Sequence, residues 1–148
     1  MSKTFNKFDG GSGALNLSLP TNTHVDLISN WGGNDTISYS NLLSVVGNSG
    51  PAFSGEASIA ANGLAIFDAA DATLAQQINA VEAAFHAGAN AGAAGHVAYW
   101  NNAGSTYALI TGDTNNAGNT HSMNDQLIKL VGVDASHVQL SNGVLIAH

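Results

Sequence analysis

The segment "LAQQINAVEAAFHAGANAGAAGHVAYWNNAGSTYALI" (residues 74–110) decides the fold class of this chain, because its hydrophobic pattern changes along it. In the first part, apolar side chains recur at steps of four, three and four residues: Leu74, Ile78, Val81 and Phe85. This spacing places them in one stripe of an amphipathic helix. The second part has two apolar runs around a polar turn, which predicts a β-hairpin. A single helix among strands indicates an α+β fold.

The helix is predicted over about residues 68–88, which are rich in alanine. Asp68 or Asp71 is the expected N-terminal cap, because a side-chain oxygen satisfies free backbone N–H groups and its negative charge meets the positive end of the helix dipole. The polar residues outside the stripe should face away from the core: Gln76, Gln77, Asn79 and Glu82. A helix with one narrow apolar stripe should pack against a sheet.

Strands are predicted after the helix. The first hairpin should consist of a strand, a turn and a returning strand: Val97–Trp100, Asn101–Gly104 and Thr106–Thr111. Residues 126–133 predict another strand. Residues 137–148 predict a last hairpin around Asn142-Gly143, because this dipeptide is typical of tight hairpin turns.

Strands are also predicted before the helix. "ALNLSL" (14–19) alternates leucine with polar residues, which is the period of a half-buried strand. Residues 24–28, 35–40 and 63–68 predict further strands, and Gly32-Gly33 favours a tight turn between the first two of these.

Two regions follow from this pattern. Residues 1–13 end in the glycine-rich "DGGSG" and are expected to form a flexible arm. Residues 14–148 are expected to form a single α+β domain, a mostly antiparallel β-sheet or sandwich with one amphipathic helix packed on it.

The chain is poor in charge. Only 9% of its 148 residues are charged, against roughly 25% in ordinary globular domains. Ten acidic residues and three basic ones give a net charge of −7. Because phosphate recognition needs Lys and Arg, nucleic acid and anionic lipid are excluded as partners. The surface is expected to be covered by Asn, Ser, Thr and Gly, which suits a protein outside the cell.

The chain contains no cysteine. Disulfides, thiolate zinc sites and cysteine nucleophiles are therefore excluded. The N-terminal "MSKTFNKFDGG" lacks the apolar region of a Sec signal peptide, and no run of 18 apolar residues predicts insertion into a membrane. We expect either a protein that stays in the cell or one whose export does not depend on the N-terminus.

Two segments resemble secreted bacterial proteins of the RTX and type I secretion class. "WGGNDTIS" (31–38) is similar to one imperfect copy of their glycine-aspartate nonapeptide, which binds calcium in a parallel β-helix when many copies stack. Residues 68–133 are similar to C-terminal regions of surface-layer proteins and adhesins of this class. The similarity lies in an Asp- and Ala-rich helix, the hairpin, the polar loop "TNNAGNTHSMND" and the closing strand "QLIKLVGV". It implies export through a channel that recognises an uncleaved C-terminal signal, and a secreted or cell-surface location.

The polar loop after the first hairpin is a candidate calcium site. Calcium-binding loops place oxygen ligands at alternate positions around a glycine turn. Asp113 and Asn115 fit the first and third positions, and Asn119 offers a backbone carbonyl at the seventh. The fifth position is Ala117 and the last acidic residue, Asp125, is one step late. The sequence therefore predicts either a polar turn or a weak calcium site, with Asp113, Asn115, Asn119 and Asp125 as its ligands.

Catalytic chemistry has little support in the sequence. There is no GxSxG motif, P-loop or HExxH motif among the six histidines. Ser105, His96 and Asp113 supply the residue types of a triad without a diagnostic spacing. His86 and His96 flank the Gly/Ala segment and suggest an alternative use as haem ligands. We therefore expect a protein without enzymatic activity.

The leading functional prediction is an exported structural protein that self-associates into a surface layer, filament or biofilm matrix, with calcium as a possible requirement. Sparse charge weakens repulsion between copies. The N-terminal arm offers a mechanism, because a strand can add to an exposed sheet edge of the next copy. The residues expected to make this contact are Phe5, Phe8, Leu15, Leu17 and Leu19. The alternative is an ordinary disordered terminus.

A second prediction is a calcium-dependent adhesin or carbohydrate-binding module that recognises cell-surface glycans. Aromatic side chains would contact the sugar rings: Trp31, Tyr99, Trp100 and Tyr107. The alternation of a strand predicts that one of Tyr99 and Trp100 lies in the core and the other lies outside.

Overall fold

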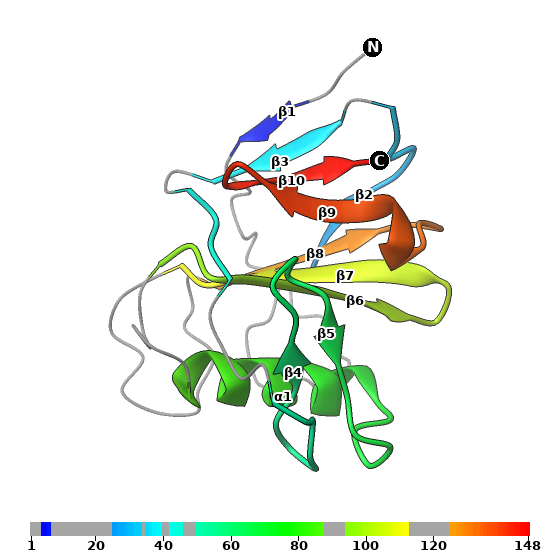
Figure 1. Ribbon diagram of the computed structural model, residues 1–148. Helices are drawn as coiled ribbons and strands as arrows, with labels where there is room; N and C mark the ends of the chain where they lie inside the picture. The colour runs from blue at the N-terminus through cyan, green and yellow to red at the C-terminus, as the bar shows by residue number, and fades with distance from the viewer. Residues whose placement is uncertain are drawn as a thin grey trace.

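In the computed structural model of the protein, the described part of the chain forms two four-stranded sheets and one α-helix, arranged in three layers (Figure 1). The structure describes the following residues: 4–6, 25–33, 35–39, 42–45, 50–87, 94–112 and 125–148. The predicted strand at residues 14–19 lies outside this part of the chain.

The strands are arranged as follows. Sheet A has the order β1 (Thr4–Asn6), β3 (Thr36–Ser38), β10 (Val144–Ala147) and β9 (Val138–Ser141). Sheet B has the order β2 (Val25–Ile28), β8 (Gln126–Leu130), β7 (Ser105–Ile110) and β6 (Val97–Asn102). The third layer holds α1 (Leu74–Ala87) and the short pair β4 (Ser58–Ile59) and β5 (Ala65–Ile66). A 3₁₀ turn, η1 (Ala135–His137), precedes β9.

Sheet B is the middle layer, so most side chains on both faces of its strands β6, β7 and β8 are buried. One cluster lies between sheet B and the helical layer and includes Ile78, Val81, Phe85, Trp100 and Leu109. The other lies between the two sheets and includes Ile37, Tyr99, Ile110, Ile128 and Leu145. The prediction that Tyr99 or Trp100 would lie outside is wrong, because each is only 1% exposed. A strand covered on both faces leaves neither set of its side chains in water.

The structure confirms the apolar stripe of the helix but corrects the predicted start of the helix and its predicted polar face. Thr73 accepts a bond from the Gln76 amide at 3.2 Å, and the Gln76 side chain accepts one from the Thr73 amide at 3.0 Å. This reciprocal pair is a capping box, so neither predicted aspartate caps the helix. Asp71 instead accepts bonds from the Gly55 amide. Glu82 is 3% exposed rather than facing solvent.

Both predicted hairpins are confirmed. In the β6–β7 turn, Ala103 and Gly104 have φ values of 47° and 73°. In the β9–β10 turn, Asn142 and Gly143 have φ values of 51° and 78°. Two successive residues with positive φ match the twist of antiparallel strands. The first turn is shorter than predicted, since Asn101 and Asn102 continue β6.

The turn predicted at Gly32-Gly33 does not join two paired strands. β2 pairs in parallel with β8 in sheet B, whereas β3 pairs with β1 and β10 in sheet A. The segment between β2 and β3 therefore crosses from one sheet to the other (Figure 1). The α+β fold with mostly antiparallel sheets and one packed helix is confirmed, with two parallel pairs in addition. Among the described residues, no helix has the length and apolar character needed to cross a membrane.

Candidate functional site

The first candidate region is the edge of sheet A formed by β1. β1 runs parallel to β3, with Thr4 opposite Thr36, Phe5 opposite Ile37 and Asn6 opposite Ser38. Part of the predicted arm thus pairs with a sheet of its own chain, and Phe5 belongs to this pairing. The other predicted arm contacts lie outside the described residues: Phe8, Leu15, Leu17 and Leu19.

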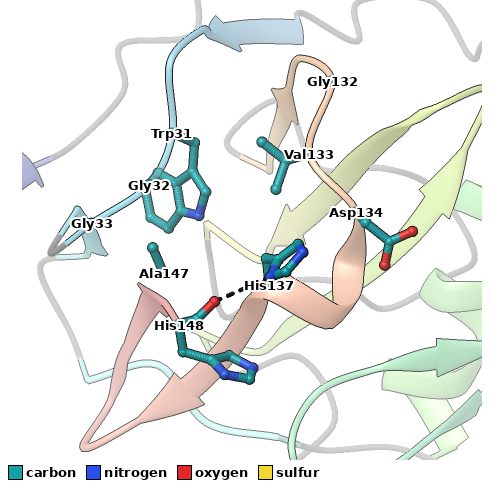
Figure 2. Close-up of a pocket in the computed structure, with 9 residues that line it drawn as sticks. All are labelled: Trp31, Gly32, Gly33, Gly132, Val133, Asp134, His137, Ala147 and His148. Carbon is teal, nitrogen blue, oxygen red and sulfur yellow. Dashed lines mark hydrogen bonds between the residues drawn. The ribbon is translucent and has the colours of Figure 1, made fainter.

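The second candidate region is a pocket of about 240 Å³ between the two sheets (Figure 2). Three segments build it: the β2–β3 crossing, and, about a hundred residues later, the β8–η1 connection with the end of η1 and the end of β10. Its lining residues are Trp31, Gly32, Gly33, Gly132, Val133, Asp134, His137, Ala147 and His148.

One wall of the pocket is apolar and the rim is polar. Trp31 is 9% exposed and Val133 and Ala147 are half-buried. Figure 2 shows the Trp31 indole directed towards His137, with Ala147 beside the space between them. His137 and His148 are exposed. The pocket therefore places an indole edge and two methyl-bearing side chains next to imidazole groups.

Asp134 supports the pocket rather than supplying a ligand group to it. Its carboxylate accepts bonds from the Ser136 amide at 2.8 Å and from Asn101 Nδ2 at 3.2 Å. In Figure 2 the carboxylate points away from Trp31. The bond from the Ser136 backbone lowers the pKa of Asp134 most, followed by bonds from the Ser136 and Asn101 side chains and by His137. The carboxylate is thus ionised at neutral pH.

His137 has a defined orientation. Its Nδ1 lies 3.3 Å from the backbone oxygen of His148, and the His148 amide donates to the His137 carbonyl at 3.2 Å. Because a carbonyl oxygen can only accept, Nδ1 is the donor in the first contact. In the neutral ring, Nε2 is then an acceptor.

The connection between β8 and η1 is fixed by the β6–β7 hairpin. Ser105 Oγ accepts a bond from the Gly132 amide at 3.2 Å, and Thr106 Oγ1 donates to the Val133 carbonyl at 2.8 Å. Asn101 Oδ1 accepts a bond from the Ala135 amide at 2.8 Å. These bonds attach this wall of the pocket to the β6–β7 hairpin, so the wall is held in place without a ligand.

The crossing segment "WGGND" is fixed in a similar way. The Gly32 amide donates to Asp35 Oδ2 at 3.2 Å, and the Ala147 amide donates to the Asp35 carbonyl at 3.1 Å. Asp35 is 3% exposed. In the segment that resembles a calcium-binding repeat, the described residues Gly32 and Asp35 are thus bonded to each other, and Asp35 is bonded to Ala147 of β10.

The predicted calcium loop lies mostly outside the described residues. Asp125 is described, and its Oδ1 accepts a bond from the Gly112 amide at 2.9 Å. The other predicted ligands, Asp113, Asn115 and Asn119, are not in the described part. Within that part, no group of three or more His, Asp or Glu side chains is arranged to hold a metal ion. The calcium site stays a prediction.

The histidine-based alternatives differ in their geometry. His96 is 3% exposed, and its Nδ1 lies 3.2 Å from Ser44 Oγ. Its ring packs against Phe85, with the ring centroids 6.1 Å apart. Ser105 begins β7, whereas His96 precedes β6 at the opposite end of the hairpin, so the structure does not bring these two members of a triad together. His86 lies at the end of α1, and its use as a haem ligand stays a prediction.

Of the aromatic residues proposed to contact sugars, Trp31 alone lines the pocket. Trp100 stacks on Tyr107 with centroids 6.2 Å apart, inside the core between sheet B and the helix. Sequence reasoning missed Val133 and His137 as companions of Trp31, because about a hundred residues separate them along the chain. No local pattern could indicate this convergence.

The sequence matches no model of a known protein family. A search of curated proteins also finds no match.

Proposed function

We propose that the protein is a non-enzymatic, exported structural protein that self-associates outside the cell by exchanging β1 between copies. The observation that carries this proposal is the position of β1. It is a three-residue strand at the edge of sheet A. The same register opposite β3 can be formed by the β1 of a second copy, because a strand pair does not depend on which chain supplies each strand.

The connection after β1 supports exchange. The segment from residue 7 to residue 24 contains 18 residues and joins β1 of sheet A to β2 of sheet B. A chain of this length can span at most roughly 60 Å. It is therefore long enough to carry β1 to a neighbouring molecule. A copy whose own β1 has left exposes the β3 edge, which is a template for an incoming strand.

The contact is directional. The strand of one copy occupies the sheet edge of the next, so the donor and acceptor surfaces differ. Such a contact produces rings when the rotation closes and filaments when it does not. The low charge content of 9% limits the electrostatic repulsion that would oppose close packing of copies.

Paired cysteines provide the test, because the chain has none of its own. Thr4 and Thr36 lie opposite each other, and neighbouring strands are about 4.8 Å apart, which suits a disulfide. A Thr4→Cys chain and a differently tagged Thr36→Cys chain are mixed, partly unfolded, refolded together and oxidised. Exchange yields disulfide-linked heterodimers, and the double variant Thr4→Cys/Thr36→Cys yields a ladder of linked chains.

The control pair is Thr4→Cys with Ser38→Cys, which is two residues out of register. The expected Cα separation is about 8 Å, beyond the reach of a direct disulfide. If the double variant gives cross-linked monomers only and the mixture gives no heterodimers, strand exchange is wrong. Electron microscopy of the unmodified chain, in millimolar calcium and in chelator, shows whether the assembly forms and whether it needs calcium.

The export part of the proposal rests on the resemblance of residues 68–133 to C-terminal regions of type I-secreted proteins. It predicts that the full chain reaches the medium of cells that carry a type I exporter and stays inside otherwise identical cells without it. Equal amounts of the chain in both media, or no chain in either medium, would contradict export by this route. Strand exchange would still be decided by the cysteine cross-linking test.

A further inference from the structure

The geometry points to a second function of the protein, in addition to self-association. The pocket between Trp31 and His137 binds one neutral sugar ring, such as a terminal or branching unit of a polysaccharide. This inference is independent of strand exchange, because β1 and β9 are the opposite edges of sheet A and the pocket lies on the side of β9 and β10.

The chemistry of the lining matches both sides of a sugar ring. Sugars present C–H groups on their faces and hydroxyl groups around their edges, so they need an apolar surface beside hydrogen-bonding groups. The indole edge of Trp31 and the side chains of Val133 and Ala147 supply the apolar surface. An exposed imidazole stands opposite. In the neutral ring, with Nδ1 of His137 directed to the backbone oxygen of His148, Nε2 can accept a bond from a hydroxyl group.

The charge of the lining selects a neutral ligand. Among the described residues, neither Lys nor Arg lines the pocket, and the Asp134 carboxylate lies beside it, directed away from Trp31. Anionic sugars and phosphates are usually bound by cationic side chains, and a carboxylate nearby repels them. A uronic acid or a sugar phosphate should therefore bind worse than a neutral hexose.

The size of the pocket limits the ligand to a single ring. Its volume of about 240 Å³ is below the roughly 300–1,000 Å³ of sites that enclose drug-sized ligands. A ligand that makes few contacts in an open site binds weakly, with a dissociation constant on the order of millimolar. The hydrogen bonds that fix Gly132 and Val133 to β7 keep the pocket in shape, so little ordering should be needed on binding.

Two measurements on the folded chain test the inference. Amide chemical shifts of the unaltered protein are followed by NMR during titration with glucose, galactose, mannose and N-acetylglucosamine, and with glucuronic acid as the anionic comparison. Tryptophan fluorescence is measured in Trp100→Phe, which leaves Trp31 as the single indole. At least one neutral sugar should give saturable shifts centred on residues 31–33, 132–134 and 147–148, together with a change in Trp31 emission.

The variant His137→Ala should weaken that binding at least about fivefold, since it removes the acceptor nitrogen. His86→Ala is the matched control, because it makes the same change on α1, outside the pocket lining. Thermal unfolding of each variant verifies that it is folded. The NMR titration uses the unaltered chain, so it tests sugar binding even if a variant does not fold.

Three outcomes would overturn the inference. The first is no saturable shift with any neutral sugar up to about 100 mM, far above a millimolar dissociation constant. The second is a set of shifts centred elsewhere in the chain or unaffected by His137→Ala. The third is tighter binding of glucuronic acid than of every neutral sugar, which would contradict the selection by charge.

Discussion

Tyr99 and Trp100 are neighbours in β6, and their side chains are buried on opposite faces of sheet B. Tyr99 packs towards sheet A, and Trp100 packs towards α1 and its associated strands. One dipeptide thus connects the two cores of the molecule. Because each side chain lies in a different cluster, substitutions at the two positions should destabilise different interfaces.

Tyr99 should make the stability of the fold sensitive to alkaline pH. Burial raises the pKa of Tyr99, whereas a tyrosine in an unfolded chain ionises near pH 10. Above about pH 10 the unfolded chain releases this proton before the folded chain does, so the free energy of unfolding falls as pH rises. Below about pH 10, the contribution of the neutral Tyr99 side chain to the free energy of unfolding is fully present. Urea unfolding at about pH 8 and about pH 11 measures the fall.

Tyr99→Phe should reduce this alkaline loss, because it removes the ionising group. Tyr107→Phe is the matched control: it makes the same change in the same sheet and leaves Tyr99 in place. An alkaline loss that is equal in the unaltered chain and in Tyr99→Phe would show that other groups cause it.

Gln77 joins the helix to the middle sheet. Its Oε1 accepts bonds from Trp100 Nε1 at 3.0 Å and from Asn102 Nδ2 at 2.8 Å. Gln77→Ala leaves the buried indole N–H without this acceptor, which should lower the free energy of unfolding by about 1–3 kcal/mol. Urea unfolding measures the loss. Gln77→Glu keeps acceptor oxygens at the same place and should lose less; an equal loss in both variants would contradict the role of this bond.

Thr73 caps α1 through the reciprocal bonds with Gln76. Thr73→Ala should lower the free energy of unfolding by about 1 kcal/mol, because the Gln76 amide loses its acceptor. Thr73→Ser retains the hydroxyl and should restore most of this stability. The comparison by chemical denaturation fails to support the cap if Ser and Ala are equally destabilising.

Gly143 combines a positive φ with a close neighbour. Its φ is 78°, and a Cβ at this position would lie 2.7 Å from Leu42 Cδ2 and 2.8 Å from Leu42 Cβ. Gly104 has a φ of 73° in the other hairpin turn and no atom within 4 Å of such a Cβ. Gly104→Ala should therefore cost about 1–2 kcal/mol for the left-handed conformation alone.

Gly143→Ala should cost at least about 1 kcal/mol more than Gly104→Ala, because overpacking adds to the backbone strain. Thermal and urea unfolding of the two variants give the difference. Equal losses would mean that Leu42, between β3 and β4, moves away from the turn without cost.

The features set by neighbouring residues could be predicted from the sequence. The stripe from Leu74 to Phe85 fixes the helix because side chains three and four apart share a face. The Asn142-Gly143 turn fixes the last hairpin because few dipeptides adopt two positive φ values. The true cap was also visible, since Thr73 and Gln76 have the spacing of a capping box, but the nearby aspartates offered competing caps.

The candidate site could be predicted only in part. The sequence predicts Trp31 as a sugar contact and the arm as the element that adds to a sheet. The partners of each came from distant parts of the chain: Val133 and His137 for the pocket, and β3 for β1. The burial of Glu82 and of both Tyr99 and Trp100 was missed as well.

The sequence by itself therefore determined the helix, the two hairpins and the α+β class, since backbone sterics and short-range contacts act within a few residues. Only the tertiary structure decided that sheet B is covered on both faces, that β2 and β3 belong to different sheets, and that a pocket forms where they part. Alternation along a strand separates its two faces but does not say how many layers will cover them. That choice depends on the total apolar area buried by the whole chain, which is a sum over residues that are far apart in sequence.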